Sequence, residues 1–66
     1  MRIVINADSE RHELHSAEPR SISSLLEELD IPPSTVLVIH AETIIPHDTI
    51  VRDDVELDLI VVSSGG

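Results

Sequence analysis

One short segment with the periodicity of a helix lies between segments with the periodicity of strands, and this pattern limits the fold more than any other feature. Four apolar residues recur at the i, i+3, i+4, i+7 spacing that gives a helix one apolar face: Ile22, Leu25, Leu26 and Leu29. Ser21 is a natural N-cap, and Ser24 with Glu27 offers a rival capping box one turn later. Pro32-Pro33 stops the helix, which we expect over Ile22 to Asp30. A helix of about nine residues is not stable alone, so it must pack on a sheet.

Five other segments alternate apolar and polar residues, as strands with one buried face do. They are residues 1–7, 11–16, 36–39, 43–45 and 55–62. Turns join the first two and the next two into hairpins, and residues 47–51 connect the second hairpin to the last strand. The order is therefore β-β-α-β-β-β. A mixed sheet wrapped over one helix in this order is the β-grasp arrangement, an α+β fold, which we predict here.

The apolar face of the helix and the inward side of the strands form the predicted core. By strand parity the inward residues are Ile3, Ile5, Leu14, Val36, Val38, Val55, Leu57, Leu59 and Val61. In a chain of 66 residues this core is small, and without cysteine no disulfide reinforces it. We expect residues 1–62 to form one β-grasp domain and residues 63–66 to be a flexible C-terminal tail.

The last strand breaks its own alternation near its end. Glu56 and Asp58 occupy the outward face, and Ile60 and Val62 then fall on that same face. Three more apolar residues are expected beside them: Val4, Leu37 and Ile39. An exposed aliphatic patch rimmed by acidic residues is typical of a partner-binding surface, which we predict at these positions. The alternatives are a sheet twist that covers some of the patch, or self-association.

The charge of the chain narrows the class of partner. Thirteen acidic residues against four basic ones give a formal net charge of −9 at pH 7. Such a charge repels phosphate backbones and anionic lipids, so we expect neither nucleic acid nor a membrane as partner. No apolar run is long enough to cross a membrane, and no signal peptide precedes the first strand. We expect a monomeric protein of the cytoplasm with a basic partner.

The chain ends in Ser63-Ser64-Gly65-Gly66, which places both of its glycines at its last two positions. With the β-grasp order, a third and fourth strand of the pattern Val36-x-Val38…Pro46 and the acidic turn Asp53-Asp54, the sequence resembles the ubiquitin-like sulfur carriers and modifiers over essentially its whole length. This ThiS/MoaD-like family includes the thiamine-pathway carrier, the small subunit of molybdopterin synthase and the small archaeal ubiquitin-like modifiers. Residues 18–38 look most similar to the archaeal members.

Two turns depart from the pattern of the family that the chain resembles. Ala41-Glu42 stands where relatives often have Asn-Gly, and Arg52-Asp53-Asp54 stands where they often have Asp-Gly-Asp. Both departures lie in turns, so they leave the predicted fold unchanged.

The resemblance implies a reactive C-terminus in a chain that is itself no enzyme and binds no cofactor. In such proteins an E1-like activating enzyme uses ATP and Mg²⁺ to adenylate the terminal carboxylate, here that of Gly66. The acyl-adenylate is then thiocarboxylated for sulfur-acceptor enzymes, or joined by an isopeptide bond to lysines of target proteins. Gly65 and Gly66 suit a narrow channel beside a nucleotide, because they carry no Cβ. Ser63 and Ser64 form a polar lead-in that contacts the enzyme.

Among the remaining polar residues, the sequence predicts no catalytic residue and no metal site. His12 and His15 are three apart on a strand, so their side chains point to opposite faces. His40 and His47 flank a hairpin without an evident third ligand, and the acids of residues 53–58 match no calcium loop. Two other functions stay open: the small subunit of a molybdopterin-synthase-like complex, or a non-catalytic β-grasp interaction module whose diglycine is incidental.

Overall fold

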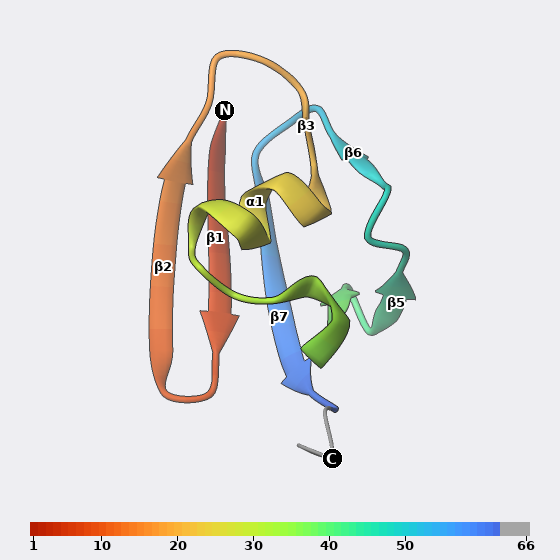
Figure 1. Ribbon diagram of the computed structural model, residues 1–66. Coiled ribbons are helices and arrows are strands. Elements are labelled where there is room, and N and C mark those ends of the chain that lie inside the picture. Colours follow the sequence, from red (N-terminus) through yellow and green to blue (C-terminus); the bar gives the residue numbers. More distant parts are fainter. Residues whose placement is uncertain (63–66) are drawn as a thin grey trace.

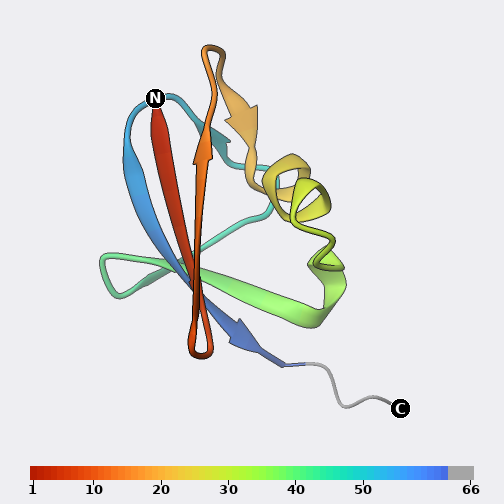
Figure 2. The ribbon, with the colours of Figure 1, turned by 90° about the vertical axis from the view of Figure 1, so that its left-hand side faces the viewer.

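Five strands form one mixed sheet in the order β2-β1-β7-β4-β5, and the helix α1 packs across one face of it (Figure 1, Figure 2). The arrangement is that of a computed structural model, which describes residues 1–62. The five strands are β1 Arg2–Ala7, β2 Glu10–His15, β4 Val36–His40, β5 Thr43–Ile45 and β7 Val55–Val61. The sheet, the helix and their order confirm the predicted α+β, β-grasp fold.

The strands from opposite ends of the chain, β1 and β7, lie side by side at the centre of the sheet (Figure 1). They pair in parallel as far as Ala7 opposite Leu59. On its other side β7 pairs antiparallel with β4 as far as Val36 opposite Val61, which lies further along β7. The two edges of β7 therefore lose their neighbours at different residues.

The start of α1, which spans Ile22–Glu28, agrees with the prediction. The Ser24 N–H donates a hydrogen bond of 3.2 Å to the Ser21 Oγ, so Ser21 is the N-cap and the rival cap one turn later is not used. The Arg20 guanidinium holds this first turn from outside, because it donates to the Ser24 carbonyl at 3.1 Å and also pairs with the Glu28 carboxylate.

The helix ends before the predicted Asp30, because Asp30 has a left-handed backbone with φ 62°. The Ile31 N–H then donates to the Leu26 carbonyl at 2.9 Å, and the Asp30 N–H donates to the Glu27 carbonyl at 3.0 Å. This is the hydrogen-bond pattern of a Schellman C-cap, with aspartate where glycine is more usual. A short 3-10 helix, η1 Pro33–Thr35, then leads into β4.

Two further strands of two residues each, β3 Arg20–Ser21 and β6 Ile50–Val51, pair antiparallel as a separate small sheet. The sequence predicted a plain connector where β6 lies. The Ile22 N–H donates to the Thr49 carbonyl at 3.0 Å, so this connector is tied to the start of α1. As a result Val51 is only 7% exposed and belongs to the core, although no alternation marked it.

The core lies between α1 and the inner face of the sheet. Its buried apolar residues are Ile3, Ile5, Ile22, Leu25, Leu26, Val36, Val38, Val51, Leu57 and Leu59. Three other residues that were predicted in the core, Leu14, Leu29 and Val55, are half-buried and pack against its margin.

The prediction that Val61 belongs to the core is wrong, because Val61 is 58% exposed. It does lie on the inner face of the sheet, like its partner Val36, which is 5% exposed. At this level β1 has ended at Ala7 and α1 has ended at Glu28, so no element within residues 1–62 covers Val61.

The turn between β4 and β5 holds two residues in the left-handed region, Ala41 with φ 52° and Glu42 with φ 67°. Positive φ at both central residues defines the type I′ turn of a two-residue hairpin, which favours Asn-Gly. Residues with a Cβ are strained in this region, so the turn costs stability.

Replacing this turn by the double substitution Ala41→Asn, Glu42→Gly is expected to raise the free energy of unfolding by about 1 kcal/mol. In a domain of this size the melting temperature should then rise by about 4–8 °C, which differential scanning calorimetry measures. The same dipeptide, Ala17-Glu18, occurs without positive φ and gives the matched control. Equal effects of both double substitutions on the melting temperature would show that the turn is not strained.

Replacing Leu26 by Asp is expected to unfold the protein. Leu26 is 0% exposed, and an unpaired carboxylate in the core costs several kcal/mol, against a total stability of about 5–15 kcal/mol. Ile44→Asp is the control, because Ile44 is 59% exposed. The ¹H–¹⁵N spectrum of Leu26→Asp should lose its dispersion while that of the control keeps it, and a dispersed Leu26→Asp spectrum would contradict the packing described above.

Candidate functional site

The helix α1 lies on one side of the sheet (Figure 2). The other, outer face carries an apolar patch over β4, β5 and the end of β7. Leu37 lies opposite Ile60, and Ile39 lies opposite both Ile44 and Asp58. We call Leu37, Ile39, Ile44, Ile60 and Val62 the outward patch. Ile60 and Val62 are about half-exposed, and Ile44 more so. The exposed Ile60 and Val62 agree with the prediction, while Leu37 and Ile39 are half-buried members of the same surface.

Val4 was predicted in this patch, and that prediction is wrong because Val4 is only 4% exposed. It lies in the middle of the sheet, where its cross-strand neighbours are Glu13 on β2 and Glu56 on β7. A short side chain between long charged ones is covered by them. Arg2, Arg11 and Glu56 line the same small hollow as Val4.

Sequence reasoning missed Ile44. The sequence feature that could have revealed Ile44 is the turn before it. A two-residue hairpin loop at Ala41-Glu42 fixes the register of the hairpin and places Ile44 opposite Ile39. Leu37, Ile44 and Pro46 also line an open hollow of about 340 Å³. The outward patch is therefore larger on its β5 side than predicted, and it offers a shallow depression to a partner.

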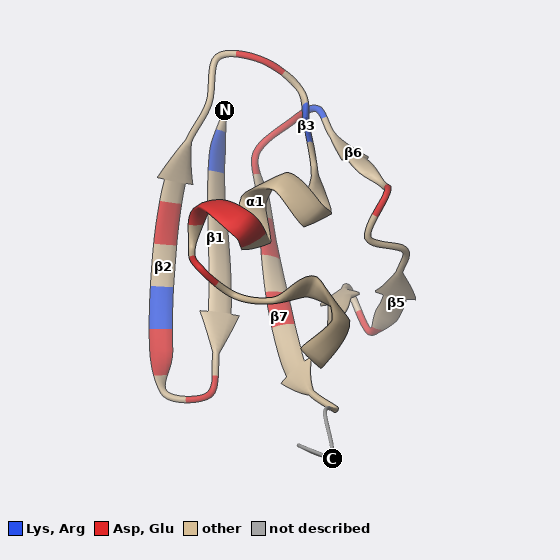
Figure 3. Ribbon diagram, in the orientation of Figure 1, with Lys and Arg blue, Asp and Glu red and all other residues tan. Residues whose placement is uncertain are grey.

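Acidic residues occur along β2 and β7 (Figure 3), and Asp58 of β7 lies opposite Ile39 of the outward patch. The Asn6 amide donates to the Glu56 Oε2 at 2.8 Å and to the Asp58 Oδ1 at 3.2 Å, which fixes these two carboxylates side by side. Beyond them the Arg2 guanidinium hydrogen-bonds to Glu13 and holds the pKa of that carboxyl below its ordinary value. An apolar surface next to ordered carboxylates suits a partner with an apolar centre and a basic rim.

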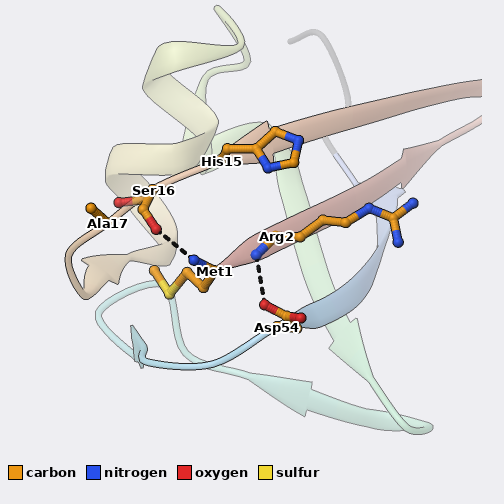
Figure 4. A pocket seen from close by; sticks show the side chains of 6 residues that line it. All are labelled: Met1, Arg2, His15, Ser16, Ala17 and Asp54. Carbon is orange, nitrogen blue, oxygen red and sulfur yellow. Dashed lines mark hydrogen bonds between the residues drawn. The ribbon is translucent and has the colours of Figure 1, made fainter.

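Another hollow, of about 520 Å³, lies at the end of the molecule that holds the N-terminus, away from the end of β7 (Figure 1, Figure 4). Its polar groups bond to one another. The Met1 ammonium donates to the Ser16 carbonyl at 2.7 Å, and the Arg2 N–H donates to the Asp54 Oδ1 at 2.7 Å. These bonds fix the start of β1 against its neighbours and leave no convergent set of free groups there.

The histidines of β2 face glutamates of their own strand. His12 lies 3.5 Å from Glu10, and His15 lies 3.4 Å from Glu13. Within residues 1–62 no three His, Asp or Glu side chains converge as metal ligands. The predicted site residues Ser63, Ser64, Gly65 and Gly66 lie outside the described residues, so the prediction for the tail stays a prediction.

Comparisons with known proteins give a family and two similar folds. The model of the ThiS family matches residues 3–66. A ubiquitin of Caldiarchaeum subterraneum superposes with a TM-score of 0.73 at 19% identity, and the match covers 100% of this chain and 98% of that one. A chain from the crystal structure of ATBAG1 in complex with HSP70 superposes with a TM-score of 0.71 at 16% identity. That match covers 92% of this chain, which spans only 40% of the ATBAG1 structure's chain.

At these identities the two structures show the fold alone. No curated protein matches the chain. None of the helices within residues 1–62 has the length and apolar character to span a membrane.

If the chain has the E1-like activating enzyme that its resemblance implies, the double substitution Ile39→Glu, Ile60→Glu is expected to weaken binding to that enzyme by about tenfold or more, because it places two charges in the outward patch. Ile50→Glu is the matched control, since Ile50 is 45% exposed and lies on β6, outside the outward patch. The KM for the carrier in the adenylation reaction measures the effect, and circular dichroism checks the fold. An unchanged KM in the folded double variant would remove the outward patch from the interface.

Proposed function

The chain belongs to the ThiS family, and on this premise we propose that it is a protein carrier whose Gly66 carboxylate is activated by an E1-like enzyme. The carboxylate attacks the α-phosphorus of ATP bound with Mg²⁺, which forms an acyl-adenylate and releases pyrophosphate. Hydrosulfide or a lysine amine of a target then displaces AMP, which leaves a thiocarboxylate or an isopeptide bond. In both routes the chain is the substrate and the enzyme is the catalyst.

The observation that carries this proposal is the extent of the family match, which runs through Gly65 and Gly66. The matched range therefore includes the diglycine. The resemblance to sulfur carriers and modifiers that the sequence suggested rests in part on the same two residues. A terminal carboxylate on a residue without a side chain can approach a nucleotide closely, as adenylation requires.

The division of β7 into a buried part and an exposed part supports this function. Leu57 and Leu59 are the last buried residues within residues 1–62, at 1% and 9% exposure, whereas Ile60, Val61 and Val62 are each about half-exposed. The last backbone hydrogen bond of the described chain runs from the Val62 N–H to the Thr35 carbonyl at 2.9 Å. We infer that an enzyme can bind the chain from Ile60 onward without disrupting the core.

The outward patch and its acidic border supply the docking surface in this proposal. Ile60 of the patch and Glu56 and Asp58 of the border lie on β7, the strand that leads to the tail, so an enzyme that binds Ile60 also lies beside the residues that follow it. We propose that the protein acts as a monomer, since the surface that would otherwise self-associate is covered by the enzyme.

The two alternatives differ from this proposal in the use of the tail. A small subunit of a molybdopterin-synthase-like complex needs the same terminal thiocarboxylate, so it is a special case of the carrier. An interaction module needs only the fold, which the ATBAG1 match illustrates within a longer chain. The presence of the diglycine within the family match favours the carrier.

Deleting Gly66, or Gly65 together with Gly66, is expected to abolish adenylation and to leave the melting temperature within about 2 °C of the full chain, because Leu59 is the last core residue. Each missing residue moves the carboxylate by about 3.5 Å, and reacting atoms must approach to about 3–3.5 Å. ATP–pyrophosphate exchange by the activating enzyme measures the loss, and Ala17→Gly, which keeps the length of the chain and lies at an exposed residue away from the tail, is the control. Normal exchange with a chain that ends at Ser64 would favour the interaction module.

A further inference from the structure

A second apolar surface lies on the inner side of β7, opposite to the outward patch. It is a hollow of about 380 Å³ beside the end of β7. Its apolar lining consists of Ala7, Leu29, Ile31, Val36, Leu59 and Val61. Ala7 ends β1, Leu29 and Ile31 follow α1, Leu59 and Val61 lie at the end of β7, and Val36 begins β4. The hollow therefore lies where several elements begin or end. We call it the inner hollow.

Val61 is the exposed apolar residue of the inner hollow. It is 58% exposed, while its neighbours in the lining, Val36 and Leu59, are 5% and 9% exposed. A valine on the core side of a central strand is ordinarily covered, and here that cover is absent from residues 1–62. The surface therefore has the buried floor and exposed apolar edge that a partner side chain can complete.

The backbone of β7 is also open beside this hollow. The pairing with β1 stops at Leu59, whereas the pairing with β4 continues to Val61. One edge of Ile60 and Val61 thus has no strand beside it within residues 1–62. An extended peptide can pair with such an edge and place alternate side chains on the two faces of the sheet.

The charges around the inner hollow are acidic. Asp8 and Glu10 line it, and the lining residues include no arginine. The one cation-forming group among them is His12, whose Nε2 lies 3.5 Å from the Glu10 carboxylate. Charge complementarity therefore points to an occupant with a basic residue next to its apolar one.

We propose that the inner hollow and the open edge of β7 receive an extended segment of the E1-like activating enzyme, which carries an aliphatic side chain beside a lysine or arginine. This inference rests on the proposed function, in which residues 63–66 enter a channel of the enzyme. The enzyme surface around that channel must then lie beside Val62. A second copy of this chain is a poor occupant, because two chains of net charge −9 repel each other. With the outward patch bound as well, the enzyme holds the end of β7 from both faces.

The test is the KM for the carrier in adenylation by the E1-like enzyme of the same organism, with the full chain and four variants. Val61→Glu should raise the KM by about tenfold or more, and Val61→Leu should stay within about twofold of the unchanged chain. Ile50→Glu, the same kind of change at a similarly exposed residue away from the tail, should leave the KM unchanged. Glu10→Gln should raise it about twofold at low salt, with less effect at high salt. Melting temperatures confirm that all four variants fold.

The outcomes separate this inference from the proposed function. If the unchanged chain is adenylated and Val61→Glu has the same KM, the inner hollow is not part of the interface while the proposed function stands. If the unchanged chain is not adenylated, both fail. A dimer in sedimentation velocity that Val61→Glu dissociates would assign the inner hollow to a second copy and overturn the proposal.

Discussion

The pairing of β7 with β1 on one side and β4 on the other is the interaction on which the rest of the structure depends. It brings the two ends of the chain together at the centre of the sheet, and it carries Leu57 and Leu59 into the core beneath α1. A parallel neighbour from the far end of the chain forms only when the intervening helix crosses over. The packing of the short helix and of the small core therefore both depend on β7.

Along β7, the residues that stabilise the core come first, and the residues that are available to a partner follow them. Up to Leu59 the strand has neighbours on both edges and is buried on its inner face. From Ile60 it has one neighbour among the described residues and is about half-exposed. Its apolar sequence nevertheless continues through Val62. Apolar residues that the core does not use are available to a partner, which is why the outward patch and the inner hollow both adjoin the residues before the tail.

The fold was predictable because local pattern and tertiary structure agree: the helix stripe with the Ser21 N-cap, and the alternation of the strands. What failed depends on neighbours that periodicity does not show. Parity placed Val61 on the correct face, but where β1 and α1 end decides whether it is covered. Val4 is buried by charged neighbours on β2 and β7, and Ile44 joins the outward patch through the register of its hairpin. The role of Gly66 could be proposed from the sequence alone, since the resemblance to sulfur carriers and modifiers implies it.

The most direct test of the central claim, that the Gly66 carboxylate is the reactive end, is intact and peptide mass spectrometry of the protein recovered from its own organism. The account predicts a C-terminal peptide whose mass shows one sulfur in place of one carboxylate oxygen, or target peptides with a lysine joined to Gly66. Protein that carries only a free Gly66 carboxylate, under conditions in which the activating enzyme is present, with no lysine-linked form among its targets, would contradict it.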